Sequence, residues 1–381
     1  MRIAIVGGSL RGTVAAYLAG KAGIESIVID KSGDMPAFSV SDAHRVMDIF
    51  EREREAMRIF GDCDAVIPAC EDPMLLSGLE EMLILSDVPL LFDMDAYIIS
   101  SSKSASNGMM RSMGIPTPGK WQDCRYPVIV KPSSHSGGDG ITKADSDDDV
   151  KEGINKIMRM GDVPLIQEFV RGNVISVDVI GHGRGHRSFA ASVIVPDERY
   201  DCKRVLCVPC AERDAELRSI AAAIAGCVDL ISLMSVEAIY SENGMKVIEI
   251  DARLPTRSPP AVLAATGINL LQETIDQKFG RAGTKAHAGV SSYEFFVITG
   301  GTMRACGEKE FAKIRHPEVV RGMFGCDEII TDHNDGRGTW RCAMICSAQN
   351  GDALEAKRKE CIRTMMSECR ITEFIDGLDH A

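Results

Sequence analysis

The sequence predicts an α/β protein whose central part is of the α+β type, and two observations carry this prediction. From Arg2 to about Asp93, short apolar strands alternate with helical segments, which is typical of a parallel sheet covered by helices. Further along, apolar strands come in pairs joined by Gly-containing loops, which is typical of antiparallel hairpins. A chain of 381 residues is long enough for two or three domains.

The N-terminal strand at residues 3–6 runs into the turn Gly7-Gly8-Ser9-Leu10-Arg11-Gly12. A helix at 13–22 and strands at 27–30, 65–68 and 90–93 follow. A dinucleotide site at this turn, with Asp30 as the ribose acid, is the weaker interpretation, because Ser9 stands where the G-x-G-x-x-G motif needs glycine. The alternatives are a simple tight turn of an α/β domain, or a turn that holds a carboxylate or amine of a substrate at the strand ends through Ser9 and Leu10, with Glu71 at the same edge.

Beyond residue 95 the pattern changes to longer helices and paired strands. Helices are expected at 102–113, 146–160, 217–230, from 270 to about 279, and at 353–368. Strands are expected at 128–131, 141–142, 165–170, 174–180, 235–239 and 247–253.

Lys131 ends an apolar strand, so its ammonium group should be largely buried and needs an anion. The Ser/Gly-rich loop that follows contains Ser133, Ser134, Ser136 and Gly137. It can offer backbone N–H groups and hydroxyls to phosphate, although it is not a Walker loop. Lys103, on the helix before this strand, is a second candidate for a cation that binds phosphate.

The strand at 247–253 carries Glu249, Asp251 and Arg253 on one face, because residues two apart on a strand point the same way. Glu237 can lie beside them if the strand at 235–239 pairs through the turn at 241–244. Three carboxylates on one patch repel each other unless a cation lies among them, and hard oxygen ligands suit Mg²⁺. The neighbouring Arg253 suits a phosphoryl or a carboxylate group.

The composition excludes several classes of protein. Lys and Arg number 43 against 55 Asp and Glu, and this net charge of −12 argues against a general nucleic-acid binder. The apolar runs are too short to span a bilayer, and the N-terminus does not read as a signal peptide. The 13 cysteines have no framework spacing, so we expect free thiols in a reducing cytoplasm.

Along the chain come a lysine on a helix, an apolar strand that ends in a lysine, a Ser/Gly-rich loop, a linker strand, and a strand with carboxylates and an arginine. This order resembles the ATP-grasp superfamily of carboxylate–amine ligases. From residue 1 to about 275 the chain most resembles the family of the pyrrolysine biosynthesis ligases, which join 3-methyl-D-ornithine to the ε-amine of L-lysine. Segments that carry this resemblance include Ala15-Ala16-Tyr17-Leu18, Gly114-Ile115-Pro116-Thr117-Pro118 and the run 247–253. Asp251 favours this family over the rest of the superfamily, because most ATP-grasp enzymes have asparagine at that position.

The resemblance implies an ATP-grasp fold with three parts. These are a Rossmann-like domain at 1–95, an ATP-grasp domain at 96–290 with a lid subdomain at about 122–182, and a small C-terminal domain at 291–381. It also implies a cytoplasmic enzyme that acts on small molecules, with neither nucleic acid nor membrane as partner. Homodimers are common in the family, which makes a homodimer the oligomer to test for.

For the cofactors, the resemblance implies ATP and two Mg²⁺ ions. Lys103 and Lys131 would hold the phosphates, with Lys131 also counted as catalytic, and residues 133–138 would fold over them. Gln167, Glu168 and Val170 would contact adenine. Glu237, Glu249 and Asp251 would bind the two metal ions. The family usually has glutamate in place of Gln167 and a more serine-rich loop around His135.

For the substrates, the resemblance gives Arg253 two alternative roles, at the transferred phosphoryl group or at the substrate carboxylate. Arg257 and Ser258 would lie near the D-amino acid, and Tyr200 and Asp201 would meet its amino groups. Asp201 or Glu71 could serve either as the base for the lysine amine or as an anchor for an ammonium group. An ATP-grasp ligase for a different pair of D-amino acid and amine is the alternative function.

Overall fold

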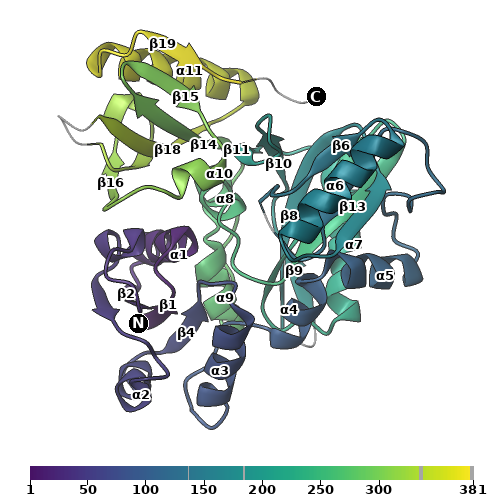
Figure 1. The fold of residues 1–381 in the computed structure, drawn as a ribbon. Coiled ribbons are helices and arrows are strands. Elements are labelled where there is room, and N and C mark those ends of the chain that lie inside the picture. The colour runs from purple at the N-terminus through teal and green to yellow at the C-terminus, as the bar shows by residue number, and fades with distance from the viewer. Residues whose placement is uncertain (136, 183–184, 334–337, 378–381) are drawn as a thin grey trace.

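The computed structural model describes residues 1–135, 137–182, 185–333 and 338–377, which contain three β-sheets (Figure 1). The N-terminal sheet is parallel and has the order β3-β2-β1-β4. Its strands are β1 (Arg2–Val6), β2 (Glu25–Asp30), β3 (Ala43–Val46) and β4 (Ala65–Pro68). The helices of this region are α1 (Leu10–Lys21), α2 (Glu53–Gly61), α3 (Pro73–Leu83) and the 3₁₀-helix η1 (Pro36–Ser39).

The parallel sheet expected at the N-terminus is confirmed, with two differences. Helix α1 begins at Leu10 and not at Thr13, because Ser9 already has the extended backbone of an N-cap residue. The strand expected at 90–93 is reduced to one bridge between Leu90 and Val66, and Asp93 instead caps the next helix by accepting a hydrogen bond from the Ala96 N–H.

A small antiparallel sheet of order β6-β5-β7 carries the Ser/Gly-rich loop. Its strands are β5 (Val128–Pro132), β6 (Thr142–Ala144) and β7 (Pro164–Glu168), and α6 (Asp147–Arg159) packs on it. Val128 and Val130 of β5 and Ile157 of α6 share a buried cluster. The hairpin expected around residues 133–140 is therefore confirmed.

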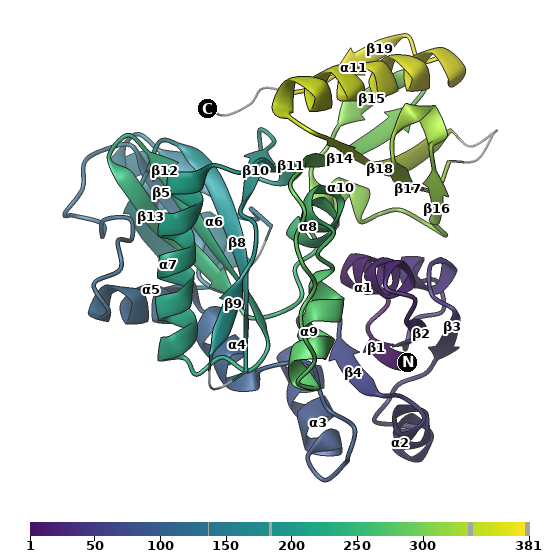
Figure 2. The same cartoon turned by 180° about the vertical axis from the view of Figure 1, so that it is seen from behind.

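The large sheet has twelve strands, with the main order β13-β12-β8-β10-β11-β14-β18-β17-β16. Its first half contains β8 (Asn173–Gly181), β9 (His186–Ser188), β10 (Ser192–Pro196), β11 (Cys202–Cys207), β12 (Leu233–Ser241) and β13 (Gly244–Asp251). One face of β8, β12 and β13 is apolar and shares a buried cluster with α4 (Met94–Ser100), α5 (Lys103–Ser112) and α7 (Ala211–Cys227). Figure 2 shows α7 lying across this face. The opposite face is left for polar side chains.

The C-terminal region continues the same sheet, because β11 pairs with β14. The sheet therefore crosses the boundary proposed at residue 290. The remaining strands are β14 (Val290–Thr299), β15 (Thr302–Ala305), β16 (Glu318–Arg321), β17 (Glu328–Thr331), β18 (Thr339–Ala348) and β19 (Glu373–Ile375). The remaining helices are α8 (Ser258–Thr266), α9 (Leu270–Lys278), α10 (Glu308–Phe311), α11 (Gly351–Glu368) and the 3₁₀-helix η2 (Met323–Gly325).

Helices α8 and α9 lie between the N-terminal sheet and the large sheet in both views (Figures 1 and 2). Asn269, which caps α9, also donates a hydrogen bond from its side chain to the Leu18 carbonyl of α1. At the other end of α1, Arg11 donates to the Leu254 carbonyl just after β13, which holds the start of the helix beside the large sheet. In the described part of the chain, every helix is too short or too polar to cross a membrane.

Candidate active site

Two cavities open on the polar side of the large sheet and meet each other. The larger, of about 400 Å³, lies between the small sheet and β12–β13, and Lys103, Lys131, Gln167 and Glu249 are among the residues that line it. The smaller, of about 260 Å³, lies between the start of α1, the polar face of β8, β12 and β13, and the starts of α8 and α10. Gly137, Ile194, Glu237 and Arg257 line both cavities. We call this shared wall the junction.

Lys103 and Lys131 both point into the larger cavity, although each is more than nine-tenths buried. Lys103 Nζ lies 2.9 Å from Glu249 Oε1 and donates to the His135 carbonyl at 2.7 Å. Lys131 Nζ donates to the Ile248 carbonyl at 3.2 Å. Burial lowers the pKa of Lys131 to about 8, and the Glu249 carboxylate only partly offsets this effect. The expected burial of Lys131 is confirmed, and Lys103 is buried as well.

The loop after β5 is arranged differently from the expectation that its hydroxyls face phosphate. The Ser133 hydroxyl lies among the hydroxyls of Ser102 and Ser104 at the start of α5. The Ser134 hydroxyl donates to Asp162 at 2.8 Å, and His135 Nδ1 lies 2.6 Å from the same carboxylate. Among the loop residues named above, His135 and Gly137 line the larger cavity. Ser136 lies outside the described residues.

The end of β7 and the linker after it line the larger cavity with Gln167, Glu168 and Val170. The Gln167 side chain is buried, and its Oε1 atom has no hydrogen-bond partner among the described residues. The Glu168 carboxylate accepts from the Gly119 N–H and lies 2.6 Å from Lys246 Nζ. An unsatisfied buried acceptor is costly, so Gln167 Oε1 fits a ligand that brings a donor, such as the amino group of adenine.

The three carboxylates proposed for metal binding lie close together but are each paired with a basic side chain. Glu237 and Glu249 are direct partners across β12 and β13, as expected from the sequence. Glu237 lies 3.3 Å from Arg257, Glu249 lies 2.9 Å from Lys103, and Asp251 lies 2.6 Å from Arg253. Within the described ranges, no three acidic, histidine or cysteine side chains are arranged to hold a metal ion by themselves.

This oxygen-donor set nevertheless fits Mg²⁺ together with a phosphate ligand. The carboxylate side chains, which line the cavities, remain 20–27% exposed. Burial would raise the pKa of Glu249, but the ammonium groups of Lys103 and Lys131 outweigh it and lower the pKa. The carboxylate is therefore ionised and ready for a cation. Mg²⁺ commonly shares carboxylates with phosphate oxygens, and the basic partners that it displaces could pair with those oxygens.

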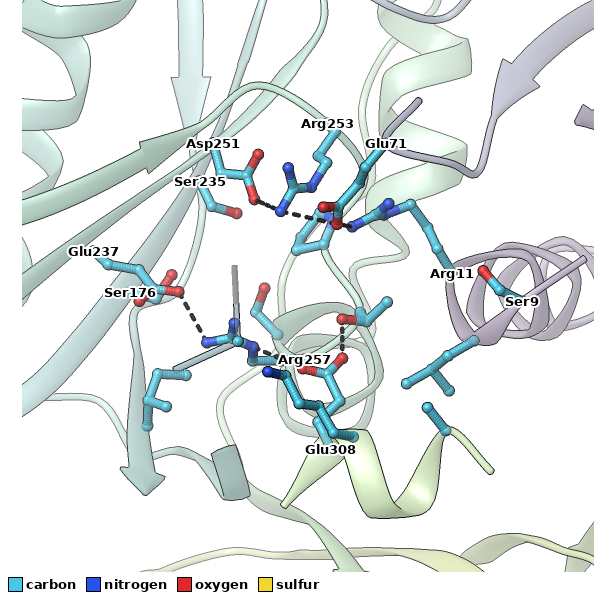
Figure 3. A pocket seen from close by; sticks show the side chains of 18 residues that line it. Ser9, Arg11, Glu71, Ser176, Ser235, Glu237, Asp251, Arg253, Arg257 and Glu308 are labelled. Carbon is cyan, nitrogen blue, oxygen red and sulfur yellow. Dashed lines mark hydrogen bonds and ion pairs between the residues drawn. The ribbon is translucent and has the colours of Figure 1, made fainter. Parts of the chain in front are cut away.

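A chain of ion pairs crosses the smaller cavity (Figure 3). Arg253 lies between Asp251 at 2.6 Å and Glu71 at 3.1 Å, and Glu71 accepts from Arg11 at 2.5 Å. Arg11 also donates to the Leu254 carbonyl. Burial raises the pKa of Asp251 to about 6, partly offset by Arg253. This wall offers both charges that an amino acid needs, next to Ser9 and Leu10 at the start of α1.

Of the other residues expected to bind substrate, Arg257, Ser258 and Tyr200 line a cavity and Asp201 does not. Arg257 and Ser258 line the smaller cavity, whereas Tyr200 lines the larger one. Asp201 lies in neither wall; its carboxylate accepts the Lys309 and Cys202 N–H groups. This position supports the backbone at α10 and does not support the expected contact with substrate amino groups. Burial raises the pKa of Asp201 to about 6.

Among the described residues, the structure adds three charged site residues that the sequence patterns did not single out: Arg11, Glu308 and Lys309. Arg11 sits in the first turn of α1, so its closeness to Ser9 and Leu10 was a usable signal. Glu308 and Lys309 lie on α10, in the part of the chain expected only to form a small C-terminal domain, and no motif marked them. Lys309 pairs with Asp139, and a Cβ on Gly137 would lie 2.7 Å from its Cε, so glycine permits this approach.

We expect Glu71→Gln to raise the KM for an amino-acid substrate about tenfold, because the variant loses a charged partner in the smaller cavity. Affinity for ADP should stay unchanged, since Glu71 does not line the larger cavity. Glu81→Gln, an exposed position on α3, is the matched control. Steady-state kinetics with each amino acid varied in turn checks this. If the Glu71→Gln variant has unchanged KM values for both amino-acid substrates, Glu71 does not contribute to substrate binding.

The family model that describes an ATP-grasp domain matches residues 100–257, which contain both lysines and all three carboxylates. The chain is 34% identical over 278 residues to 3-methyl-D-ornithine–L-lysine ligase of Methanosarcina acetivorans, an alignment that covers 73% of each protein. It is 24% identical over 311 residues to carbamoyl-phosphate synthase of Methanobrevibacter smithii, covering 75% of this chain and 82% of that one.

Two solved structures illustrate the similarity in fold. The biotin carboxylase domain of 2-oxoglutarate carboxylase from Hydrogenobacter thermophilus, solved with MgADP, ADP and bicarbonate, gives a TM-score of 0.74 at 14% identity and covers 95% of this chain and 89% of that one. N5-carboxyaminoimidazole synthetase from Staphylococcus aureus, solved with ADP, gives a TM-score of 0.68 at 17% identity. The match covers 95% of this chain and 96% of that one. At such identities the likeness concerns the fold.

Proposed function

This chain belongs to the ATP-grasp carboxylate–amine ligases, in the family of the 3-methyl-D-ornithine–L-lysine ligases, and from that premise we propose its reaction. The chain joins the carboxylate of (3R)-3-methyl-D-ornithine to the ε-amine of L-lysine at the expense of ATP, as a step of pyrrolysine biosynthesis. The observation that carries the proposal is the meeting of two cavities at Glu237 and Arg257. One cavity suits a nucleotide and the other suits charged amino acids.

ATP occupies the larger cavity in this proposal. Gln167 Oε1, which lacks a partner in the described structure, accepts the adenine amino group. Lys103 and Lys131, which line the same cavity, hold phosphate oxygens. The γ-phosphoryl group then lies at the junction, where the smaller cavity begins.

Glu237, Glu249 and Asp251 would hold two Mg²⁺ ions in the proposed complex, and these ions would supply charge neutralisation for phosphoryl transfer. The protein's own contribution is to position the acid's carboxylate in the smaller cavity in line with the γ-phosphorus. A carboxylate is a poor electrophile because it is already an anion. Conversion to an acyl phosphate gives it a leaving group, and the walls of the cavity keep water from that group.

The ε-amine of lysine attacks the acyl phosphate in the second step. Its reference pKa of about 10.4 means that it must lose a proton before it can attack. Of the two acids considered for this role, Glu71 lines the smaller cavity and Asp201 does not. Glu71 is therefore the proposed acceptor of this proton or the anchor of the ammonium group that carries it.

The reducing cytoplasm is the proposed compartment, since all thirteen cysteines are free thiols.

The test is to follow ADP formation and product mass with ATP, Mg²⁺, L-lysine and 3-methyl-D-ornithine. ADP should form at full rate only when both amino acids are present, with an amide product of the combined mass less one water. D-ornithine and other D-amino acids, each offered with several amines, form the comparison panel. A better pair in that panel would establish the alternative ATP-grasp ligase, and no amide product with any pair would reject the ligase proposal.

A further inference from the structure

Glu308 reaches the junction from the C-terminal region, 51 residues after the arginine that it contacts. Its carboxylate accepts from Arg257 Nε at 2.9 Å and also from the Thr256 hydroxyl. The Glu308 side chain is only 12% exposed, so it has little access to solvent as an alternative partner. Helix α10, which carries Glu308, is held in place by Asp201 through the Lys309 N–H. The glutamate is therefore fixed on both its side chain and its backbone.

Arg257 is held between two carboxylates, one from each side (Figure 3). Its Nε faces Glu308, and its Nη1 lies 3.3 Å from Glu237. Burial would lower the pKa of Arg257, but Glu237 and Glu308 outweigh it and raise the pKa, so the guanidinium stays charged. The two contacts use different nitrogens, so a ligand can replace Glu237 while Glu308 keeps its hold.

Arg257 and Arg253 occupy different places in the site. Arg257 lines both cavities, and it is the basic side chain that the two walls share. Arg253 lines the smaller cavity, where Asp251 and Glu71 hold it. A phosphoryl group that moves from the larger to the smaller cavity must pass Arg257. Arg253 lies away from the junction, in the part of the smaller cavity where an amino-acid carboxylate would bind.

We propose that Arg257 is the cation that meets the γ-phosphoryl group during transfer, and that Glu308 is a positioning residue that aims it there. In this step, which rests on the proposed function, a carboxylate oxygen of the acid forms a bond to the γ-phosphorus. The bond from phosphorus to the β–γ bridging oxygen breaks, and ADP leaves with that electron pair. Glu237 would hold Mg²⁺ in the ATP complex, which would free Arg257 Nη1 for the phosphoryl oxygens while Glu308 keeps the guanidinium in place.

The first test compares Glu308→Gln with Glu310→Gln, because both variants lose an ion pair of α10. Glu310 pairs with Arg341 and Lys313 and does not line either cavity. Glu308→Gln should lower kcat by about 10–100-fold, the range seen when groups that orient site residues are lost, with little change in the KM for ATP. Glu310→Gln should keep the wild-type kcat. Equal kcat values for the two variants would overturn the inference.

A double-mutant cycle separates positioning from a merely structural role. If Glu308 acts through Arg257, the variant with both Arg257→Met and Glu308→Gln should be no slower than Arg257→Met alone. Losses that multiply would overturn the inference. Arg257→Lys, which keeps the charge but not the planar contact with Glu308, provides a second variant if Glu308→Gln is poorly folded, and it should show the same loss of kcat.

The second readout needs no amino-acid substrate. MgADP with aluminium fluoride imitates the phosphoryl group in transfer, whereas MgADP alone leaves the junction empty. Glu308→Gln should weaken binding of the fluoride complex at least tenfold relative to Glu310→Gln and leave MgADP binding unchanged; equal weakening of both would overturn the inference. If Glu308→Gln selectively loses binding of the fluoride complex but the wild type makes no amide product, the proposed reaction fails and the assignment of Arg257 stands.

Discussion

Glu249→Gln should lower the rate of ADP formation by roughly 10²–10³-fold, the loss typical of removing one preorganised electrostatic group from an active site. Glu249 lies opposite Glu237 on the β12–β13 hairpin and pairs with Lys103. Glutamine keeps the size of the side chain and one oxygen but loses the charge that a metal ion needs. The fold should remain, because the side chain lies at the cavity wall and not among the apolar residues of the sheet.

Glu242→Gln is the control for this variant, because it makes the same charge change at an exposed position in the turn of the same hairpin. Circular dichroism and thermal unfolding establish that both variants are folded, and an ADP assay gives their rates. The control should turn over like the wild type. Wild-type turnover by Glu249→Gln would reject the metal-site assignment.

Lys131→Met should weaken ATP binding by roughly 10–100-fold, because a charge-assisted contact to phosphate is lost. It should also remove a proton linkage. Burial lowers the pKa of Lys131 to about 8, so much of the free protein above that pH carries a neutral amine. ATP phosphates favour the ammonium form, so binding takes up a proton there, and the wild-type affinity falls as the pH rises through about 8.

Isothermal titration calorimetry at pH 8.5 in two buffers of different ionisation enthalpy measures this proton uptake. The wild type should take up a fraction of a proton, and Lys131→Met should take up less. Between about pH 8 and 10.5, the unfolded chain holds a proton that the folded, ATP-free chain lacks, so this lysine makes stability rise with pH in that range. In the calorimetry experiment, equal proton uptake on ATP binding by the wild type and by Lys131→Met would show that Lys131 does not contact the phosphates.

The fold elements that could be predicted from the sequence are those whose signals are local. The alternation along residues 247–253 places Glu249 and Asp251 on one face, and the turn before it places Glu237 opposite Glu249. The apolar run before Lys131 predicts its burial, because its neighbours on the strand must face a core. In each case the determining residues lie within a few positions of one another.

The parts that could not be predicted depend on partners far away in the chain. The Ser134 hydroxyl faces away from the cavity because Asp162, 28 residues later, accepts its hydrogen bond. Asp201 supports α10, more than one hundred residues later. Glu308 joins the site because β11 pairs with β14 and brings the C-terminal region over the junction. No short pattern around these residues encodes the contact.

The fate of oxygen atoms tests most directly whether a phosphoryl group passes from one cavity to the other. The acid substrate is prepared with ¹⁸O in both carboxylate oxygens, and the phosphate released during amide formation is analysed by mass spectrometry. An acyl phosphate formed at the junction predicts one ¹⁸O atom in each phosphate released. Phosphate without the label, alongside a correctly formed amide, would contradict transfer to the carboxylate and the roles assigned to Glu237 and Arg257.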